Sequence, residues 1–158
     1  MHPKLELLLT ALDQAFDHKA WHGTTLRGSV RGLSAEAAAW RPAPGRHNVW
    51  EIVLHTAYWK YIVRRRVTGV RDAPFPRKGS NWFASPASPS EREWRADVAL
   101  LQEEHRKLRD AVAAFPPRDL GKLSPKKKWT REEEIFGIAA HDLYHAGQIQ
   151  LLKRLRTP

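Results

Sequence analysis

Apolar residues recur at spacings of three and four positions in four long segments of the chain, which is the period of an amphipathic α-helix. No segment shows the strict alternation of apolar and polar residues that marks a half-buried strand. The sequence also lacks an internal repeat, a glycine-rich phosphate loop and a G-x-S-x-G elbow. The pattern therefore predicts an all-α protein, a four-helix bundle in which residues 1–158 form a single domain.

The first predicted helix runs from about Pro3 to Val30, because its apolar pattern continues past two glycines near its end. Ser34 can cap a short helix that ends at Trp40, and the proline- and glycine-containing segment 41–47 predicts a loop. The stripe of the first helix consists of Leu5, Leu9, Leu12, Phe16, Leu26 and Val30.

The second main helix is predicted to begin after Asn48, which can cap it together with Glu51, and to end at Gly69. Its inward stripe places His55 among apolar neighbours, where a buried core histidine with a hydrogen-bond partner is the simplest interpretation. The stripe consists of Ile52, His55, Trp59 and Ile62.

A connection of about twenty residues follows, from Gly69 to Pro89, and its four prolines predict a loop without helix. Loops of this length in compact domains are usually crossovers or lids. Trp82 and Phe83 are the apolar residues that could anchor it over an opening in the bundle.

The third main helix is predicted to begin at a capping box of Ser90 and Glu93 and to end before Pro116 and Pro117. His105 lies within its apolar stripe, and we assign it to packing and not to metal binding. The stripe consists of Trp94, Val98, Leu101, His105, Leu108, Val112 and Phe115.

The fourth main helix covers Trp129 to Arg156, with Thr130 and Glu133 as its capping box. His141 and His145 lie one turn apart on its inward face, between Ile138, Ile149 and Leu152. Two such imidazoles can reach a single divalent ion, although a pair by itself also suits ordinary core histidines.

A third histidine strengthens the metal interpretation if the second and fourth helices run antiparallel. His55 lies 14 residues before Gly69, and His141 and His145 lie 11 and 15 residues after Thr130, so all three would stand at nearly the same height. If the two helices were parallel, His55 would lie about 9 Å along the axis from the midpoint of His141 and His145, at 1.5 Å per residue. The long connection after Gly69 also favours a bundle whose two middle helices run in the same direction.

The segments WEIVLHTAYW and HDLYHAGQIQLLKRL resemble the metal-binding motifs of the DinB-like superfamily, which includes the YfiT-type proteins. The resemblance covers nearly the whole chain. It implies an up-down-down-up four-helix bundle, a homodimer, and a divalent metal held by His55, His141 and His145. Three ligands leave open positions for water or substrate, as in catalytic sites, and zinc and nickel both accept imidazole. The alternative is a core polar cluster without metal.

The chain carries no cysteine, which excludes disulfides and a thiolate ligand and fits a cytoplasmic protein. Its N-terminus predicts an amphipathic helix and not a signal peptide, and no stretch is long enough to cross a membrane. The net charge of +10 makes anionic partners plausible. The basic runs Arg64–Arg66, Lys126–Lys128 and Lys153–Arg156 lie at helix ends and in a loop, however, and predict a solvated surface.

These observations favour a metal-dependent enzyme with a small-molecule substrate, and we expect a thiol S-transferase, an activity found in the resembled family. The absence of cysteine, the lack of a glutamate base beside His141 and His145, and the basic charge support an anionic low-molecular-weight thiol. A hydrolase that activates water at the metal is the alternative. A further alternative is a non-enzymatic, nucleic-acid-binding stress protein, and only the basic charge supports it. No catalytic base is assigned; Trp59, Tyr144 and Gln148 are candidate pocket neighbours.

Overall fold

The computed structural model describes residues 2–70, 73–124 and 128–156, and they are all-helical apart from loops. Within these ranges there is no strand, only an isolated antiparallel bridge between Leu123 and Thr130. This confirms the all-α prediction. The helices are α1 (Pro3–Phe16), α2 (Leu26–Val30), α3 (Ala35–Ala39), α4 (Val49–Thr68), α5 (Glu91–Ala113) and α6 (Arg131–Arg156), with a 3₁₀ turn η1 (Pro117–Asp119).

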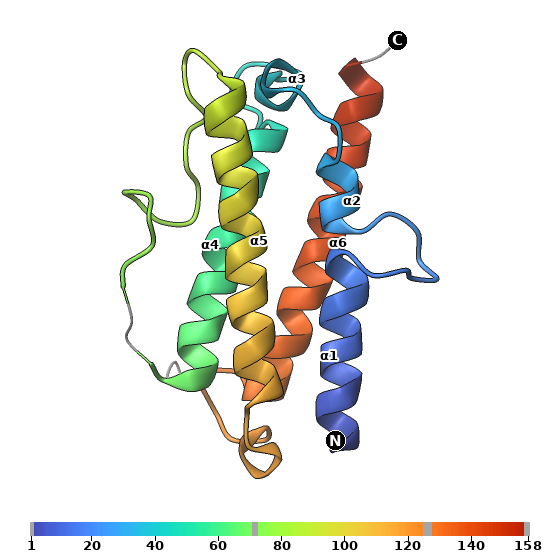
Figure 1. Cartoon of the computed structure of the whole chain (residues 1–158), viewed down its shortest axis with the longest axis vertical. Helices are drawn as coiled ribbons and strands as arrows, with labels where there is room; N and C mark the ends of the chain where they lie inside the picture. Colours follow the sequence, from blue (N-terminus) through green and yellow to red (C-terminus); the bar gives the residue numbers. More distant parts are fainter. Residues whose placement is uncertain (1, 71–72, 125–127, 157–158) are drawn as a thin grey trace.

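The four long helices form a bundle in which α1 and α6 run one way and α4 and α5 run the other (Figure 1). In the order of the chain the directions are up, down, down and up, as predicted. The helix α4 packs against both α5 and α6, and α1 packs against α6 and α5. Since α4 and α6 are antiparallel neighbours, the heights of their side chains follow the register expected from the sequence.

Side-chain caps fix the starts of the long helices. The side chain of Asn48 accepts a hydrogen bond from the backbone nitrogen of Glu51, and α4 ends at Gly69, which has a left-handed φ of 74°. Thr130 and Glu133 exchange hydrogen bonds between side chain and backbone at the start of α6. These predicted boundaries are confirmed.

The prediction of one continuous helix from Pro3 to Val30 is wrong. The helix α1 ends at Phe16, and a loop leads to Thr25, whose hydroxyl caps the separate helix α2 by accepting from the backbone nitrogen of Gly28 at 3.1 Å. Gly23 in this loop has a φ of 103°, which a helix does not allow. Leu26 and Val30 are nevertheless buried, so apolar spacing alone could not reveal the interruption.

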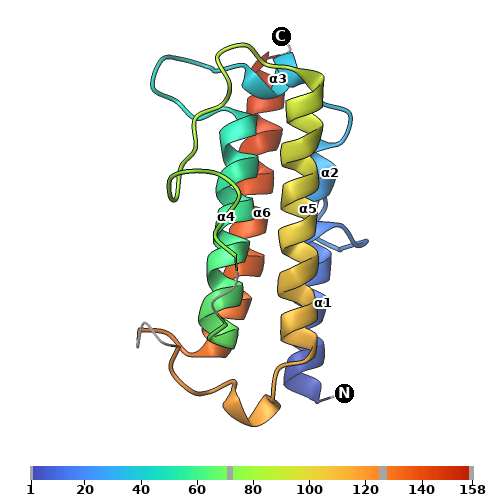
Figure 2. The ribbon, with the colours of Figure 1, turned by 60° about the vertical axis from the view of Figure 1, so that its left-hand side comes forward.

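The connection between α4 and α5 runs back along α4 from one end of the bundle to the other (Figure 2). Phe75 and Phe83 are buried and pack around Tyr58, and their ring centroids lie 5.4 and 5.5 Å from the centroid of its ring. Phe83 thus anchors the loop as expected. This anchoring holds residues 79–83 against the middle of α4, where His55 lies.

Several charged side chains are buried in the middle of the bundle. Lys60 on α4 and Asp142 on α6 form an ion pair with no exposed side-chain surface, and Arg64 pairs with Glu104 on α5 at 3.5 Å. We expected Arg64 to belong to a solvated basic run, but only 8% of it is exposed. The face of α4 that is buried in the bundle therefore includes charged residues as well, and it is wider than the apolar residues alone indicate. Lys126 and Lys127, in the second basic run, lie outside the described residues.

No described helix combines the length and the apolar character that crossing a lipid bilayer requires.

Candidate metal centre

Three histidines from two helices meet between α4 and α6. The Nε2 atom of His141 lies 3.1 Å from Nε2 of His55 and 3.1 Å from Nε2 of His145. All three ligand atoms lie within 4.8 Å of one another. The antiparallel packing of α4 and α6 therefore brings together the three histidines that the sequence singled out.

Hydrogen bonds on the far sides of two rings determine which nitrogen faces the centre. Nδ1 of His55 donates to the backbone carbonyl of Asn81 at 2.8 Å, and Nδ1 of His145 donates to the amide oxygen of Gln148 at 2.7 Å. An oxygen of this kind only accepts, so the proton resides on Nδ1 and the lone pair on Nε2 points inward. Partners of this type orient metal-binding histidines and raise their basicity.

Asn81 is a site residue that the sequence analysis missed. Its φ is 63°, a left-handed value that asparagine tolerates better than most residues. Besides holding His55 through its backbone, it accepts a hydrogen bond from Nε1 of Trp59 at its side-chain oxygen, at 2.9 Å. The run Gly79, Ser80, Asn81 is a turn signal in the sequence, but nothing local indicates that the turn reaches α4.

Aromatic rings surround the three imidazoles. Trp82 lies between two histidine rings, stacked on His55 with centroids 3.9 Å apart and on His47 at 3.6 Å. The ring of Tyr144 meets that of His145 edge to face at 5.1 Å. Trp82 thus covers the site, where we expected it to anchor the loop over an opening. The candidate neighbours Trp59, Tyr144 and Gln148 also lie beside the three rings.

Burial keeps the imidazoles neutral. It lowers the pKa of His141 to about 3 and that of His145 to about 4, with the neighbouring histidines adding to the effect. The pKa of His55 is lowered too, mainly by burial. Neutral imidazoles whose lone pairs face one another at 3.1 Å repel unless a proton or a cation lies between them. The donor set therefore fits a divalent ion that accepts nitrogen ligands.

The carboxylate nearest in sequence does not join this group. Asp142 follows His141 directly, but it points into the core and pairs with Lys60. In the described part of the chain, no carboxylate forms a hydrogen bond with any of the three rings. A cation bound by His55, His141 and His145 would keep its full charge, because all three ligands are neutral.

His105, which we assigned to packing, lies apart from the three histidines. Its ring stacks on Phe16 with centroids 3.7 Å apart, and burial lowers its pKa to about 2. It is not a member of the group that could hold a metal.

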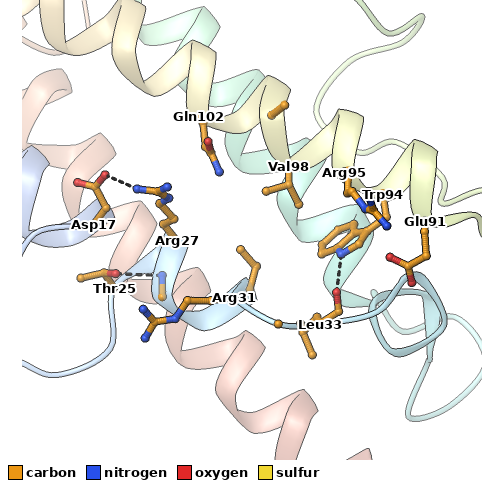
Figure 3. A pocket seen from close by; sticks show the side chains of 14 residues that line it. Asp17, Thr25, Arg27, Arg31, Leu33, Glu91, Trp94, Arg95, Val98 and Gln102 are labelled. Atoms are coloured by element: carbon orange, nitrogen blue, oxygen red, sulfur yellow. Dashed lines mark hydrogen bonds and ion pairs between the residues drawn. The ribbon is translucent and has the colours of Figure 1, made fainter.

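A separate cavity of about 650 Å³ lies between α2 and α5 (Figure 3). Two pairs of polar groups at its edge are engaged with each other: Arg27 pairs with Asp17 at 3.2 Å, and Nε1 of Trp94 donates to the carbonyl of Leu33 at 2.8 Å. None of the three clustered histidines lines it. The three-histidine group and this cavity are thus different places on the molecule.

A family model described as the DinB superfamily matches residues 18–149, a range that contains all three clustered histidines. No curated protein and no solved structure matches the chain.

Proposed function

The chain belongs to the DinB superfamily, and on that premise we propose that it is a metal-dependent enzyme whose divalent ion is held by His55, His141 and His145. One observation carries the proposal: the three Nε2 atoms converge, and those of His55 and His145 have their lone pairs inward. Zinc and nickel are the metals that we propose, because both accept three imidazoles and leave positions open.

The reaction that we propose is the transfer of a low-molecular-weight thiol to an electrophilic carbon. A divalent ion with neutral ligands supplies positive charge that favours the deprotonated form of a thiol at neutral pH. In the transfer, a carbon–sulfur bond forms, the bond from carbon to the leaving group breaks, and the thiol proton passes to solvent.

The residues of the chain position this chemistry. Asn81 and Gln148 hold two imidazoles in the tautomer that presents Nε2. Trp82 covers His55 and excludes water from that side of the site. With no carboxylate hydrogen-bonded to the rings in the described part, a nucleophile that ionises readily suits the site better than one that needs a general base.

A cation close to the site supports an acidic thiol. The guanidinium of Arg66 lies 5.4 Å from the ring of Trp59, whose Nε1 is bound to Asn81. Its ion pair with Glu134 is 3.5 Å long, a distance that leaves the pairing loose. Arg66 is therefore our candidate for attracting the carboxylate of a small anionic thiol.

The experiment compares metal-loaded with metal-free protein across a panel of acidic and neutral thiols and a chromogenic electrophile. We expect conjugation to depend on the metal and to be abolished by His141→Ala. The preference for acidic over neutral thiols should weaken as the salt concentration rises. Ester and amide hydrolysis are measured alongside. If only hydrolysis depends on the metal, the proposed activity changes from transferase to hydrolase. If neither conjugation nor hydrolysis depends on the metal, the proposal that the protein is an enzyme fails.

The basic surface gives less support to nucleic-acid binding than the sequence suggested. In the run Arg64–Arg66, Arg64 is buried beside Glu104 and Arg65 donates to the hydroxyl of Tyr61. These charges are directed at the protein itself. We therefore rank nucleic-acid binding below the enzyme.

A further inference from the structure

Three aromatic rings form a stack that leads from the surface of the protein to the three-histidine group. The side chain of His47 is 47% exposed, Trp82 is half-buried, and only 6% of His55 is exposed. The rings of His47 and Trp82 are within 6° of parallel, and those of Trp82 and His55 are within 12°. On this side of the group, Trp82 therefore lies between solvent and His55.

Glu51 holds the outermost ring of the stack. Its side chain is only 7% exposed, and Nδ1 of His47 donates to it at 2.8 Å. The guanidinium of Arg41 donates to both oxygens of the same carboxylate. Burial raises the pKa of Glu51, but the hydrogen bonds from Arg41 and His47 outweigh burial and hold the pKa below its ordinary value. The carboxylate is therefore charged, and it orients the ring of His47 against Trp82.

The backbone on both sides of Trp82 is held in place. The carbonyl of Asn81 accepts from His55, and the side chain of Phe83 is buried. The hydroxyl of Ser85 accepts from Nδ2 of Asn48 at 2.8 Å. Residues 81–85 would have to break these contacts to move away as a unit. A rotation of the Trp82 side chain to another rotamer leaves them intact and breaks only the stacking on the two histidine rings.

We propose that the indole of Trp82 is a gate to the three-histidine centre, and that His47, positioned by Glu51 and Arg41, holds this gate closed. In the closed state the indole covers the ring of His55. When the indole turns out of the stack, that ring becomes open to a molecule from solvent. His47 is a positioning residue that acts through Trp82, and it is not a member of the group that could hold a metal.

The size of the effect follows from the stacking. Each aromatic pair of this kind stabilises the closed state by an amount that corresponds to about two- to tenfold in population. Removing the ring of His47 takes away one of the two pairs, so the open population should rise about fivefold. The inference concerns the centre of the proposed function, but access to His55 is also defined in the metal-free chain, so the gate and the reaction are tested separately.

Chemical modification of the metal-free protein measures access. Diethyl pyrocarbonate modifies neutral imidazoles, and mass spectrometry of peptides gives a rate for each histidine. We expect His47→Ala to raise the rate at His55 about fivefold. Two other histidines serve as references within the same protein: His22 is exposed, and His105 is buried to the same extent as His55. The rates at both should stay unchanged. An equal rise at His105 would indicate a looser fold and would overturn the gate.

Three further variants test whether the ring of His47 is what matters. His47→Phe keeps the stack and should remain near the wild type, whereas His47→Gln keeps a donor for Glu51 without the ring and should resemble His47→Ala. His18→Ala is the matched control, because His18 is also exposed and bonded to a carboxylate, that of Asp17, at 2.7 Å. It should leave the rate at His55 unchanged. Opening in His47→Phe equal to that in His47→Ala would refute the stacking argument.

Double variants test the order of the contacts. Trp82→Ala should raise the rate at His55 at least as much as His47→Ala does, and adding His47→Ala to it should have no further effect. Glu51→Gln should raise the rate about twofold in the wild type and not at all in His47→Ala. If neither Trp82→Ala nor His47→Ala changes the rate at His55, access is by another side and the proposal fails. An effect of His47→Ala that persists without Trp82 would show that His47 does not act through it.

Metal exchange gives a second measurement, on the zinc-loaded protein. A gate changes how fast an ion passes but not how tightly it is bound, so His47→Ala should speed zinc uptake and zinc loss to excess chelator by the same factor. The dissociation constant for zinc should stay the same. A changed dissociation constant would show that His47 acts on the ligands themselves and would overturn the gate. A wild-type chain that binds no zinc would contradict the proposed function, and the modification rates would still decide the gate.

Discussion

The backbone carbonyl of Asn81 accepts a hydrogen bond from Nδ1 of His55 at 2.8 Å, across 26 residues of sequence. Of all non-glycine residues in the described ranges, Asn81 alone has a positive φ. An unusual backbone conformation in the loop therefore sets the tautomer of a proposed metal ligand on α4. Strain of this kind persists where the surrounding structure holds it in place, as the bond from Trp59 does here.

Replacing Asn81 separates the roles of its backbone and its side chain. Asn81→Gly and Asn81→Ala both remove the bond to Trp59, but only alanine disfavours the left-handed φ, by about 1 kcal/mol. We expect Asn81→Ala to weaken metal binding about tenfold and Asn81→Gly to change it much less. Competition titration with a chelator measures both. Equal losses in the two variants would assign the effect to the side-chain amide.

Replacing a proposed metal ligand should lower the metal content, whereas replacing His105 should not. We expect about one divalent ion per chain, lost when His55, His141 or His145 is replaced by alanine, because two remaining ligands bind far more weakly. His105→Ala should retain the metal, since that ring packs on Phe16. Elemental analysis after reconstitution with zinc and nickel measures the metal content of the wild type and of each variant. A metal-free wild-type protein would disprove the site.

The buried pair of Lys60 and Asp142 should show strong energetic coupling. Burial lowers the pKa of Lys60 and raises that of Asp142, so each charge depends on the other for compensation. Lys60→Met or Asp142→Leu alone should cost about 3–5 kcal/mol of unfolding free energy, whereas the double variant should lie near the wild type. Urea denaturation of the three variants measures the coupling. Additive losses would show that the charges do not compensate each other.

His105 should make folding sensitive to acid. Its pKa is about 2 in the folded chain, against an ordinary value of 6.5, because burial disfavours the charged ring. As the pH falls below 6.5, the unfolded chain takes up a proton that the folded chain does not. Unfolding free energy should thus fall by about 1.4 kcal/mol per pH unit for this group.

In metal-free His105→Leu, the dependence of stability on pH between 6.5 and 4 should be flatter by that amount. His55, His141 and His145 contribute to the remaining slope, because their pKa values are lowered in the same direction. Denaturation at a series of pH values checks this. An unchanged slope would mean that His105 is protonated in the folded protein.

Binding to DNA or RNA should be weak and should lack sequence preference. Basic residues such as Arg64 and Arg109 face carboxylates of the chain, so few phosphates can be neutralised at once. Mobility-shift assays across a salt series should show affinity that falls steeply between low and physiological salt. Tight, selective binding at physiological salt would favour the nucleic-acid alternative over the enzyme.

The sequence by itself determined the long helices α4, α5 and α6 and the three inward histidines. Caps such as Asn48 with Glu51, and the 3.6-residue period, act within a few residues of the chain, so they can be read locally. The height of His55 relative to His141 and His145 also followed, because helical rise is constant once α4 and α6 are taken as antiparallel. The break after Phe16 had local signals in Gly23 and Thr25, but the apolar spacing on either side obscured them.

Only the tertiary structure placed Asn81 and Trp82 on His55, buried Arg64, and left large apolar residues of α6 such as Tyr144 and Leu151 exposed. Each of these outcomes depends on how distant segments pack. A loop of about twenty residues can close in many ways at similar entropic cost, so its own composition does not specify where its middle lies. A helix with apolar residues on more than one side likewise does not specify which side faces the core, and the packing of α1, α2 and α4 against α6 made that choice.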